Sequence, residues 1–278
     1  MTSGSSLICL VTGAAGGIGQ QVVRQLAEKQ FHVMATDFNL DALKNVAKMA
    51  SWPDDLVSLC ALDVTKTGDW SACIQEIQNR WHRLDVLFNI AGYLKPGFIE
   101  DITDEDIDRH TMVNFKGVAL GCHYAAEVMK RQKKGHIINV ASMAALVPVP
   151  GLSLYSASKY AVRSFSLACA QELKSFGIAV TVVCPDPVET PMLRLQEDYV
   201  AAAITFTTSK VLRPENVATV LTNRVLLKRP REVTLPPLRG LLARLGDFLP
   251  SLTEFLMPIM RKSGLKKQQQ RVKIRMKT

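Results

Sequence analysis

The chain has 278 residues, of which 47% are hydrophobic and 21% charged, and this composition excludes the disordered and fibrous classes. A chain of this length can bury a core without disulfides or metals, and α/β folds of this size often form one domain. The net charge of +9 comes almost entirely from segment 261–278, which holds eight basic residues and no acidic one, so the rest of the chain is nearly neutral.

Cysteine spacing and hydropathy indicate the compartment. The six cysteines form no CxxC pair and no metal-ligand spacing, so we expect buried, reduced thiols and no metal site. We find neither a signal peptide nor an uninterrupted apolar run of about 18 residues. The chain is therefore expected to be cytoplasmic and to lack a membrane-spanning helix.

Short apolar segments alternate with longer segments of helical periodicity as far as Cys184. Strands are expected at 6–12, 32–37, 56–62, 84–89, 136–140 and 178–184. Helices are expected at 17–29, 40–50, 69–81 and 153–176, and the length of 104–133 suggests two more. The strand segments are rich in Val, Ile and Leu, as in strands buried on both faces. This alternation predicts an α/β fold with a parallel sheet and helices on both faces.

The pattern changes beyond Cys184. Segment 191–210 is mixed and apolar-rich, 214–227 is expected to be a helix with a proline in its first turn, and 232–235 a last strand. From Leu238 onward apolar residues again recur at helical spacing.

A proline at position 250 interrupts this last apolar pattern. Ser251 and Glu254 then offer a capping box for a second helix. We therefore expect a catalytic domain over 1–237, two short amphipathic helices over 238–260 and a polar basic tail over 261–278.

The glycine-rich turn Thr12-Gly13-Ala14-Ala15-Gly16-Gly17-Ile18-Gly19 lies between the first strand and the first helix. Glycines permit a tight turn and let the backbone approach a pyrophosphate, which then faces the free N–H groups at the helix N-terminus. A glycine-rich turn alone is a weak signal, but the strand–turn–helix context supports dinucleotide binding. Predicted contacts in the turn are Thr12, Gly13, Gly17, Ile18 and Gly19.

Two aspartates end the next two strands. Asp37 can accept hydrogen bonds from the adenosine ribose hydroxyls and would repel a 2′-phosphate. Because no Arg or Lys lies in the turn or beside Asp37, NAD is favoured over NADP. The alternative is that Asp37 only forms a turn before Asn39. Asp63 could meet the adenine edge, although an aspartate at a strand end is commonly a cap.

With these motifs in order, the chain resembles the single-domain branch of the short-chain dehydrogenase/reductase family, over roughly residues 6–190 and on to about 235. The matching motifs, in chain order, are the TGAAGGIG turn, Asp63-Val64, Asn89-Ile90-Ala91-Gly92, Asn114 with Gly117, Ser142 and Tyr155-Ser156-Ala157-Ser158-Lys159. A YxxxK pair alone is common by chance, whereas these motifs together, in register, are specific. The resemblance implies one Rossmann-like, doubly wound domain with about seven strands, and often a homo-oligomer.

The resemblance also implies a catalytic tetrad of Asn114, Ser142, Tyr155 and Lys159. Tyr155 and Lys159 lie four positions apart, so they share a helix face. A free tyrosine has a pKa of about 10, and an ammonium about 4 Å away is expected to lower it enough for proton transfer. Ser142 would hydrogen-bond the substrate oxygen, Lys159 would hold the nicotinamide ribose, and Asn114 would hold a water that relays protons.

Taken singly, each of these residues has a structural interpretation. Tyr155 and Lys159 could be a surface pair, Ser142 a cap, and Asn114 a backbone brace. Their joint spacing favours a site. The family pattern also departs at two positions, because Ile90 replaces a second Asn and Asp186 replaces the glycine after Pro185.

Asp186 places a carboxylate near the reacting ring, in a backbone position that glycine usually fills. Pro185, Val188 and Thr190 still match positions that meet the nicotinamide in the family. Asp186 is also the feature that supports the alternative function, a catalytically silent NAD-binding sensor or interaction protein.

Segment 191–210 follows the sixth strand, where α/β folds form their binding crevice. Its apolar residues indicate either a substrate lid or a packed core helix. A lid would favour a hydrophobic alcohol or ketone of lipid, sterol or polyprenoid type. Residues 238–278 suggest peripheral contact with an anionic membrane, or else packing on the body or on a twin subunit. Nucleic-acid binding is not expected, because the tail lacks aromatic residues for stacking.

Overall fold

A computed structural model describes residues 6–208 and 210–276. Its centre is a seven-stranded sheet in the order β3-β2-β1-β4-β5-β6-β7, and all neighbouring strands are parallel. The strands are β1 (Ile8–Thr12), β2 (His32–Asp37), β3 (Val57–Ala61), β4 (Val86–Asn89), β5 (Gly135–Val140), β6 (Ile178–Pro185) and β7 (Glu232–Leu235). The predicted Rossmann-like fold is confirmed. Its strand order reverses between β1 and β4, where such sheets open a crevice at their carboxyl ends.

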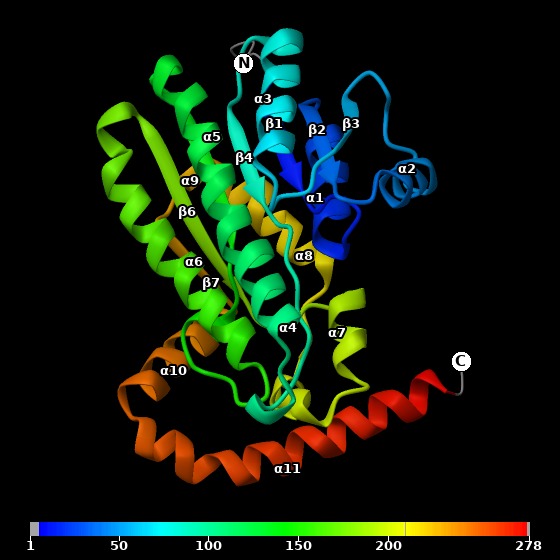
Figure 1. Cartoon of the computed structure of the whole chain (residues 1–278), viewed down its shortest axis with the longest axis vertical. Helices are drawn as coiled ribbons and strands as arrows, with labels where there is room; N and C mark the ends of the chain where they lie inside the picture. Colours follow the sequence, from blue (N-terminus) through cyan, green and yellow to red (C-terminus); the bar gives the residue numbers. More distant parts are fainter. Residues whose placement is uncertain (1–5, 209, 277–278) are drawn as a thin grey trace.

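Two apolar cores form on the two faces of the sheet (Figure 1). One core packs α3 (Thr67–Trp81), α5 (Gly117–Gln132) and α6 (Ser153–Glu172) against the strands. The other contains α1 (Gly17–Glu28) and α2 (Leu40–Met49), and also α8 (Pro214–Thr219) with its continuation. Because the strands are covered on both sides, their continuous apolar composition follows directly.

The segment predicted as two helices over 104–133 is one continuous helix with a π-helical centre. It consists of α4 (Asp104–Arg109), η2 (His110–Lys116) and α5, with helical backbone angles at both junctions. A second π-helical segment, η6 (Val220–Val225), joins α8 to α9 (Leu226–Lys228). π-Helical turns insert an extra residue into a helix and are frequent at functional sites. Asn114 lies in η2 and is fully buried.

The C-terminal segment is more ordered than its sequence predicts. It forms α10 (Pro237–Phe248) and α11 (Pro250–Arg275), so residues 261–275 extend a helix rather than a polar tail. Residues 277 and 278 lie outside the described part. The predicted capping box does not form, because α11 begins at Pro250 and leaves Ser251 inside its first turn. Figure 1 shows α11 crossing the bottom of the molecule from α10 to the side of α7 (Pro191–Gln196).

Tertiary contacts explain the length of α11. It packs against the 3-10 segment η5 (Val200–Thr207), and a Cβ at Gly264 would come 2.0 Å from the Ala203 carbonyl oxygen. Among the described residues, no helix is both long enough and apolar enough to cross a bilayer. All six cysteines are free thiols, and Cys60 is the one that is partly exposed.

Candidate active site

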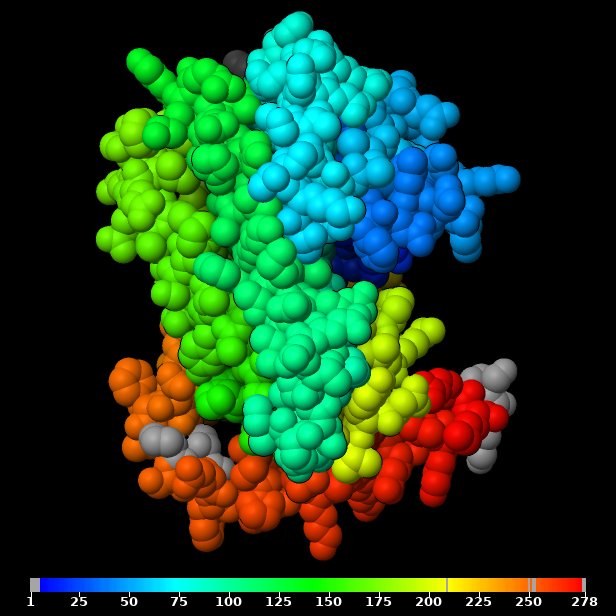
Figure 2. All heavy atoms as spheres, in the orientation of Figure 1, coloured from blue at the N-terminus to red at the C-terminus, as the bar shows by residue number. Residues whose placement is uncertain are grey.

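A cavity of about 920 Å³ opens at the carboxyl ends of the central strands. It runs from the turn between β1 and α1 to α7 and η5, and Figure 2 shows the molecule hollowed between the blue elements and yellow α7. The predicted site residues in its wall are Gly13, Gly17, Ile18, Gly19, Asp37, Asp63, Val64, Ala91, Gly92, Ser142, Tyr155, Lys159, Pro185, Val188 and Thr190. Tertiary folding therefore brings most of the predicted site to one space.

The turn between β1 and α1 needs glycine at two positions because other segments of the protein approach it closely. Gly13 has a φ of +67°, and a Cβ there would lie 2.8 Å from the Ala91 Cα. A Cβ at Gly17 would lie 2.6 Å from Cγ2 of Thr190. The N-terminus of α1 has no side-chain cap, so its first N–H groups remain for an anion. These residues fit the diphosphate of a dinucleotide.

Asp37 is buried at the end of β2 and also supports the turn. Its Oδ2 accepts a hydrogen bond from the Ala15 amide at 3.1 Å, and its Oδ1 accepts one from the Asn39 amide at 3.3 Å. A carboxylate has about four acceptor positions, so both oxygens retain capacity for ribose hydroxyls. Asp37 therefore forms the local turn and also lines the cavity. The turn-forming role and the ribose-binding role that the sequence suggests are thus compatible.

Asp63 is held by its own turn. Its Oδ1 accepts hydrogen bonds from the Thr65 amide at 3.0 Å and the Thr65 hydroxyl at 2.7 Å. Partial burial raises the pKa of Asp63, but these bonds and the charge of Lys66 outweigh it and hold the pKa below the usual value. Asp63 is thus a turn-forming carboxylate that remains ionised in the cavity wall.

Tyr155 and Lys159 lie on the first turns of α6, and Ser142 follows β5. The Lys159 ammonium is buried and donates a hydrogen bond to the Val140 carbonyl at 3.0 Å. Its nitrogen lies 5.6 Å from the centre of the Tyr155 ring. A Cβ at Gly92 would come 3.5 Å from the same nitrogen, so this glycine keeps the space above Lys159 open.

The electrostatics of this pair differ from the sequence-based expectation. Burial raises the pKa of Tyr155 to about 12, although a hydrogen bond with Ser142 partly counteracts it. Burial also lowers the pKa of Lys159 to about 8. Lys159 therefore does not by itself lower the pKa of Tyr155 as the sequence predicts. Burial makes the ammonium form of Lys159 less favourable, and its hydrogen bond goes to the Val140 carbonyl.

Three predicted site residues stand behind the cavity wall. Thr12 is buried, and its hydroxyl oxygen accepts hydrogen bonds from the Ile90 and Ala91 amides at 3.1 and 3.2 Å. Asn89 donates to Oδ1 of Asn139 at 2.9 Å in a buried network. These two side chains join β1, β4 and β5 to the loops that form the cavity, so they position the site without lining it.

Asn114 also acts as a brace. Its Oδ1 accepts from the Tyr93 amide at 2.7 Å, and its Nδ2 donates to the Tyr93 carbonyl at 2.9 Å and to the Ser158 hydroxyl at 3.0 Å. The side chain thus connects η2 to the loop after β4 and to α6. A water held by this residue stays a prediction.

Asp186 is buried and paired instead of strained. Its φ is not positive, and its Oδ2 lies 3.0 Å from Nε of Arg239 and accepts a hydrogen bond from the Thr208 hydroxyl at 3.1 Å. Burial raises the pKa of this carboxyl, while Arg239 and Thr208 oppose the rise. Asp186 therefore attaches α10 and segment 191–210 to the end of β6. This structural role gives no support to the alternative that the protein is catalytically silent.

Several residues of the cavity wall carry no local signal in the sequence. Gln196 of α7, Arg239 of α10 and Met260 of α11 line it together with the apolar lid residues. The helical pattern over residues 238–260 was visible in the sequence, but no local signal showed that these helices fold back over the site. Arg271 was likewise assigned to a tail, although it lies 2.7 Å from Glu189 and 2.8 Å from Glu197.

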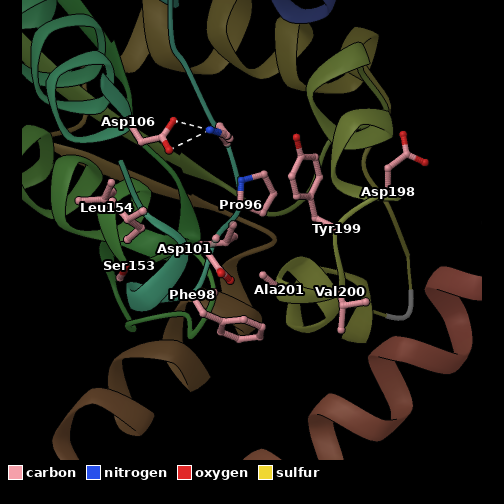
Figure 3. Close-up of a pocket in the computed structure, with 15 residues that line it drawn as sticks. Pro96, Phe98, Asp101, Asp106, Ser153, Leu154, Asp198, Tyr199, Val200 and Ala201 are labelled. Atoms are coloured by element: carbon pink, nitrogen blue, oxygen red, sulfur yellow. Dashed lines mark hydrogen bonds and ion pairs between the residues drawn. The ribbon is translucent and has the colours of Figure 1, made fainter. Parts of the chain in front are cut away.

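A smaller cavity of about 360 Å³ lies beside the lid (Figure 3). The Tyr199 ring points toward Pro96 there, and the Lys95 ammonium bonds to both oxygens of Asp106 at 2.9 and 2.8 Å. Neither Tyr155 nor Lys159 borders this space, so the larger cavity remains the candidate active site.

Comparisons with known proteins agree with this geometry. The family model described as "short chain dehydrogenase" matches residues 7–199. The cyclopentanol dehydrogenase of Comamonas is 36% identical over 185 residues, which cover 66% of this chain and 74% of that protein. The 3-oxoacyl-(acyl-carrier-protein) reductase FabG of Thermotoga maritima is 32% identical over 216 residues, covering 77% of this chain and 88% of the relative.

A solved structure gives the same fold over nearly the whole length. It is a short chain dehydrogenase/reductase from Burkholderia phymatum in complex with NAD. Its TM-score is 0.80 at 24% identity, with coverage of 91% of this chain and 97% of that chain. At this level of identity the likeness supports the fold alone.

Proposed function

Because the chain belongs to the short-chain dehydrogenase family and is a nicotinamide-dependent oxidoreductase acting on CH–OH groups, we propose that it interconverts a hydrophobic alcohol and its ketone. The observation that supports this most directly is the shared cavity of Ser142, Tyr155, Lys159 and the glycine turn. Each step of this reaction can be assigned to particular residues of the cavity.

A nicotinamide cofactor held by this cavity would supply the hydride chemistry. Ser142 and Tyr155 bind the substrate oxygen from one side, and Tyr155 exchanges the hydroxyl proton. Lys159 holds the nicotinamide ribose with its ammonium, whose other hydrogen bond goes to Val140. The turn around Gly13 holds the diphosphate, and Val188 with Thr190 meets the carboxamide side of the ring.

The pKa values favour Tyr155 as a proton donor. With a pKa of about 12, the hydroxyl is protonated at neutral pH and can donate to the developing alkoxide in ketone reduction. Alcohol oxidation needs the phenolate, which extra positive charge beside Tyr155 would stabilise. Lys159 is largely protonated below its pKa of about 8 and supplies part of that charge.

NAD is the proposed cofactor, in preference to NADP. The Asp37 carboxylate faces the part of the cavity next to the turn, and its oxygens bond to neutral backbone amides and not to an Arg or Lys. A 2′-phosphate at this place would meet an unneutralised negative charge.

A hydrophobic substrate is supported by the lid side of the cavity. Met192, Leu193 and Ile204 line it, Met260 reaches it from α11, and Val149 borders it from the loop after β5. Methionine side chains adapt to apolar ligands of different shapes. The proposed substrates are therefore lipid-like, sterol-like or polyprenoid-like alcohols and ketones.

Peripheral contact with an anionic membrane through residues 238–278 is proposed as well, together with a homo-oligomeric state. The support for membrane contact is the outward apolar face of α10, including Leu241 and Leu245, which are 55% and 50% exposed. Multi-angle light scattering of the purified chain measures the oligomeric state.

Replacement of Tyr155 by Phe tests the reaction. We expect Tyr155→Phe to lower kcat for reduction of decan-2-one by roughly 10²- to 10⁴-fold, because the proton donor is lost, while NADH affinity stays within about twofold. NADH fluorescence measures both quantities. The control is Tyr124→Phe on α5, which removes a hydroxyl outside the cavity. Retention of more than about a tenth of the wild-type kcat in Tyr155→Phe would rule out the proposed role.

A further inference from the structure

A second large space lies between α6 and α11. This groove, here called the α6–α11 groove, measures about 1060 Å³. Its walls are the loop Val147–Pro150, the outward face of α6 and the first half of α11.

The groove adjoins the candidate active site. Val147 and Val149 border both the groove and the cavity that contains Tyr155. On α11, Met260 lines the cavity while Met257 lines the groove one turn earlier. On α6, Tyr155 lines the cavity and Ala157 lines the groove. The two spaces therefore meet at Val147 and Val149, and Tyr155 and Ala157 lie two positions apart on α6.

The chemistry of the groove suits hydrocarbon. Valine, proline, methionine and leucine supply half of the residues in its wall. The Tyr160 hydroxyl is engaged with Asp247 of α10 at 3.0 Å, and the Ser156 hydroxyl accepts from the Val149 amide at 3.3 Å. The charge of Arg261 lies over the Phe98 ring, 5.2 Å from its centre. These three polar groups of the wall are thus engaged with protein partners, while Glu254 and Lys262 place charges in the wall on the α11 side.

We propose that the α6–α11 groove binds the hydrocarbon tail of the substrate, with the carbonyl or hydroxyl group at Tyr155 and the tail passing Val149. This inference rests on the proposed function and narrows the substrate to long-chain or polyprenoid alcohols and ketones. The tail would lie against Ala157 on α6 and Met257 on α11. C-terminal helix α11 then determines substrate length.

A ketone series with a filled groove tests the proposal. The kcat/KM values for methyl ketones from butanone to dodecan-2-one are measured with NADH for the wild type and for Ala157→Phe. For the wild type, kcat/KM is expected to rise about threefold to fourfold per added methylene once the tail reaches the groove. In Ala157→Phe, that rise disappears for the long ketones, while kcat/KM for butanone stays unchanged.

Ala168→Phe is the matched control, because Ala168 is an exposed alanine of the same helix outside the groove. It should keep the wild-type dependence on chain length. Met257→Trp fills the groove from α11 and should reproduce Ala157→Phe. The proposal is overturned if the groove variants retain the wild-type slope, or if they lower kcat/KM for butanone and dodecan-2-one equally.

A binding measurement distinguishes failure of this proposal from failure of the proposed function. If the wild type reduces none of the ketones, the proposed function fails, and calorimetric titration with decan-2-one still tests the groove. Weaker binding to Ala157→Phe than to Ala168→Phe, by about tenfold or more, would support the tail site. Equal binding to the two variants would overturn it.

Discussion

Tyr155 and Lys159 illustrate how burial sets the chemistry of single residues. Both are ionisable groups in an apolar wall, so desolvation moves the pKa of the phenol up to about 12 and that of the amine down to about 8. Both shifts favour the neutral form more than in the free side chain. A cationic ligand beside them reverses the effect for the phenol, so the protonation state of the pair depends on what the cavity holds.

The cofactor preference depends on one carboxylate. We expect Asp37→Ala to raise kcat/KM with NADPH at least tenfold, because the charge that repels a 2′-phosphate is removed. NADH use should fall more modestly through loss of the ribose hydrogen bonds. Steady-state kinetics with both cofactors measure the change. Asp41→Ala, an exposed acidic residue of α2, is the control and should leave the ratio of NADH to NADPH use unchanged. A wild-type preference for NADPH would contradict the assignment.

At the scale of elements, the second half of α11 is hydrogen-bonded to segment 191–210 and to Glu189 beside the cavity. Arg271 bonds to both oxygens of Glu189, next to Thr190 in the cavity wall, and to the buried Glu197. The Gln268 side chain donates to the carbonyls of Gln196, Glu197 and Tyr199 at 2.8 to 3.2 Å. These bonds attach α11 to the segment around α7, so the position of the lid depends on the C-terminal helix.

Removal of Arg271 is predicted to loosen the lid. In Arg271→Ala, Glu197 keeps a buried charge with one fewer partner, so the free energy of unfolding should fall by about 2–4 kcal/mol. The KM for decan-2-one should rise about tenfold, with a smaller effect on kcat. Urea denaturation and steady-state kinetics measure these changes.

Two further variants complete this test. Lys273→Ala on the exposed side of α11 is the control and should behave like the wild type. Adding Glu197→Gln to Arg271→Ala should restore part of the stability, because the buried charge is removed. An Arg271→Ala protein with unchanged KM would show that α11 does not position the lid.

At the scale of the whole molecule, α10 is oriented with its polar face inward. Arg239 pairs with Asp186, Arg244 lies 2.7 Å from Glu232, and Asp247 accepts from Tyr160. The opposite face carries large apolar side chains that are at least half exposed. They are Leu238, Leu241, Leu242, Leu245, Phe248 and Leu249. On α11, Phe255 and Ile259 are also exposed, and their spacing places them on one helical stripe with the exposed Lys262 and Lys266.

This surface predicts binding to anionic vesicles. The wild type should float with phosphatidylcholine vesicles that contain phosphatidylserine, and less with phosphatidylcholine alone, because basic residues each contribute about 1 kcal/mol near such a surface. Leu241→Ser combined with Leu245→Ser should weaken binding at least tenfold through lost apolar burial. Flotation in a density gradient measures the bound fraction.

Leu227→Ser in α9 is the control, since Leu227 is 80% exposed but lies outside α10 and α11. It should float like the wild type. If the wild type stays in solution with every vesicle and the paired variant instead dissociates a dimer, the apolar face is an interface between two copies. Light scattering of the same samples distinguishes these outcomes.

Local patterns in the sequence were sufficient for the fold and for most of the site. Buried parallel strands require continuous apolar segments, the turn after β1 requires glycine at Gly13, and the i, i+4 spacing of Tyr155 and Lys159 places both on one helix face. The NAD preference and the apolar lid were also inferred from neighbouring residues, and they stay predictions.

Only the tertiary structure decided which predicted residues face the cavity and where the C-terminal segment lies. Thr12, Asn89 and Asn114 turned inward as braces because their hydrogen-bond partners belong to other strands and loops. The acidic partners of Arg271 lie 74 and 82 positions away in sequence, so local sequence predicts a free basic tail, and only folding places Glu189 and Glu197 beside Arg271. Contacts at such separations leave no periodic trace in the sequence, since they depend on how whole elements pack.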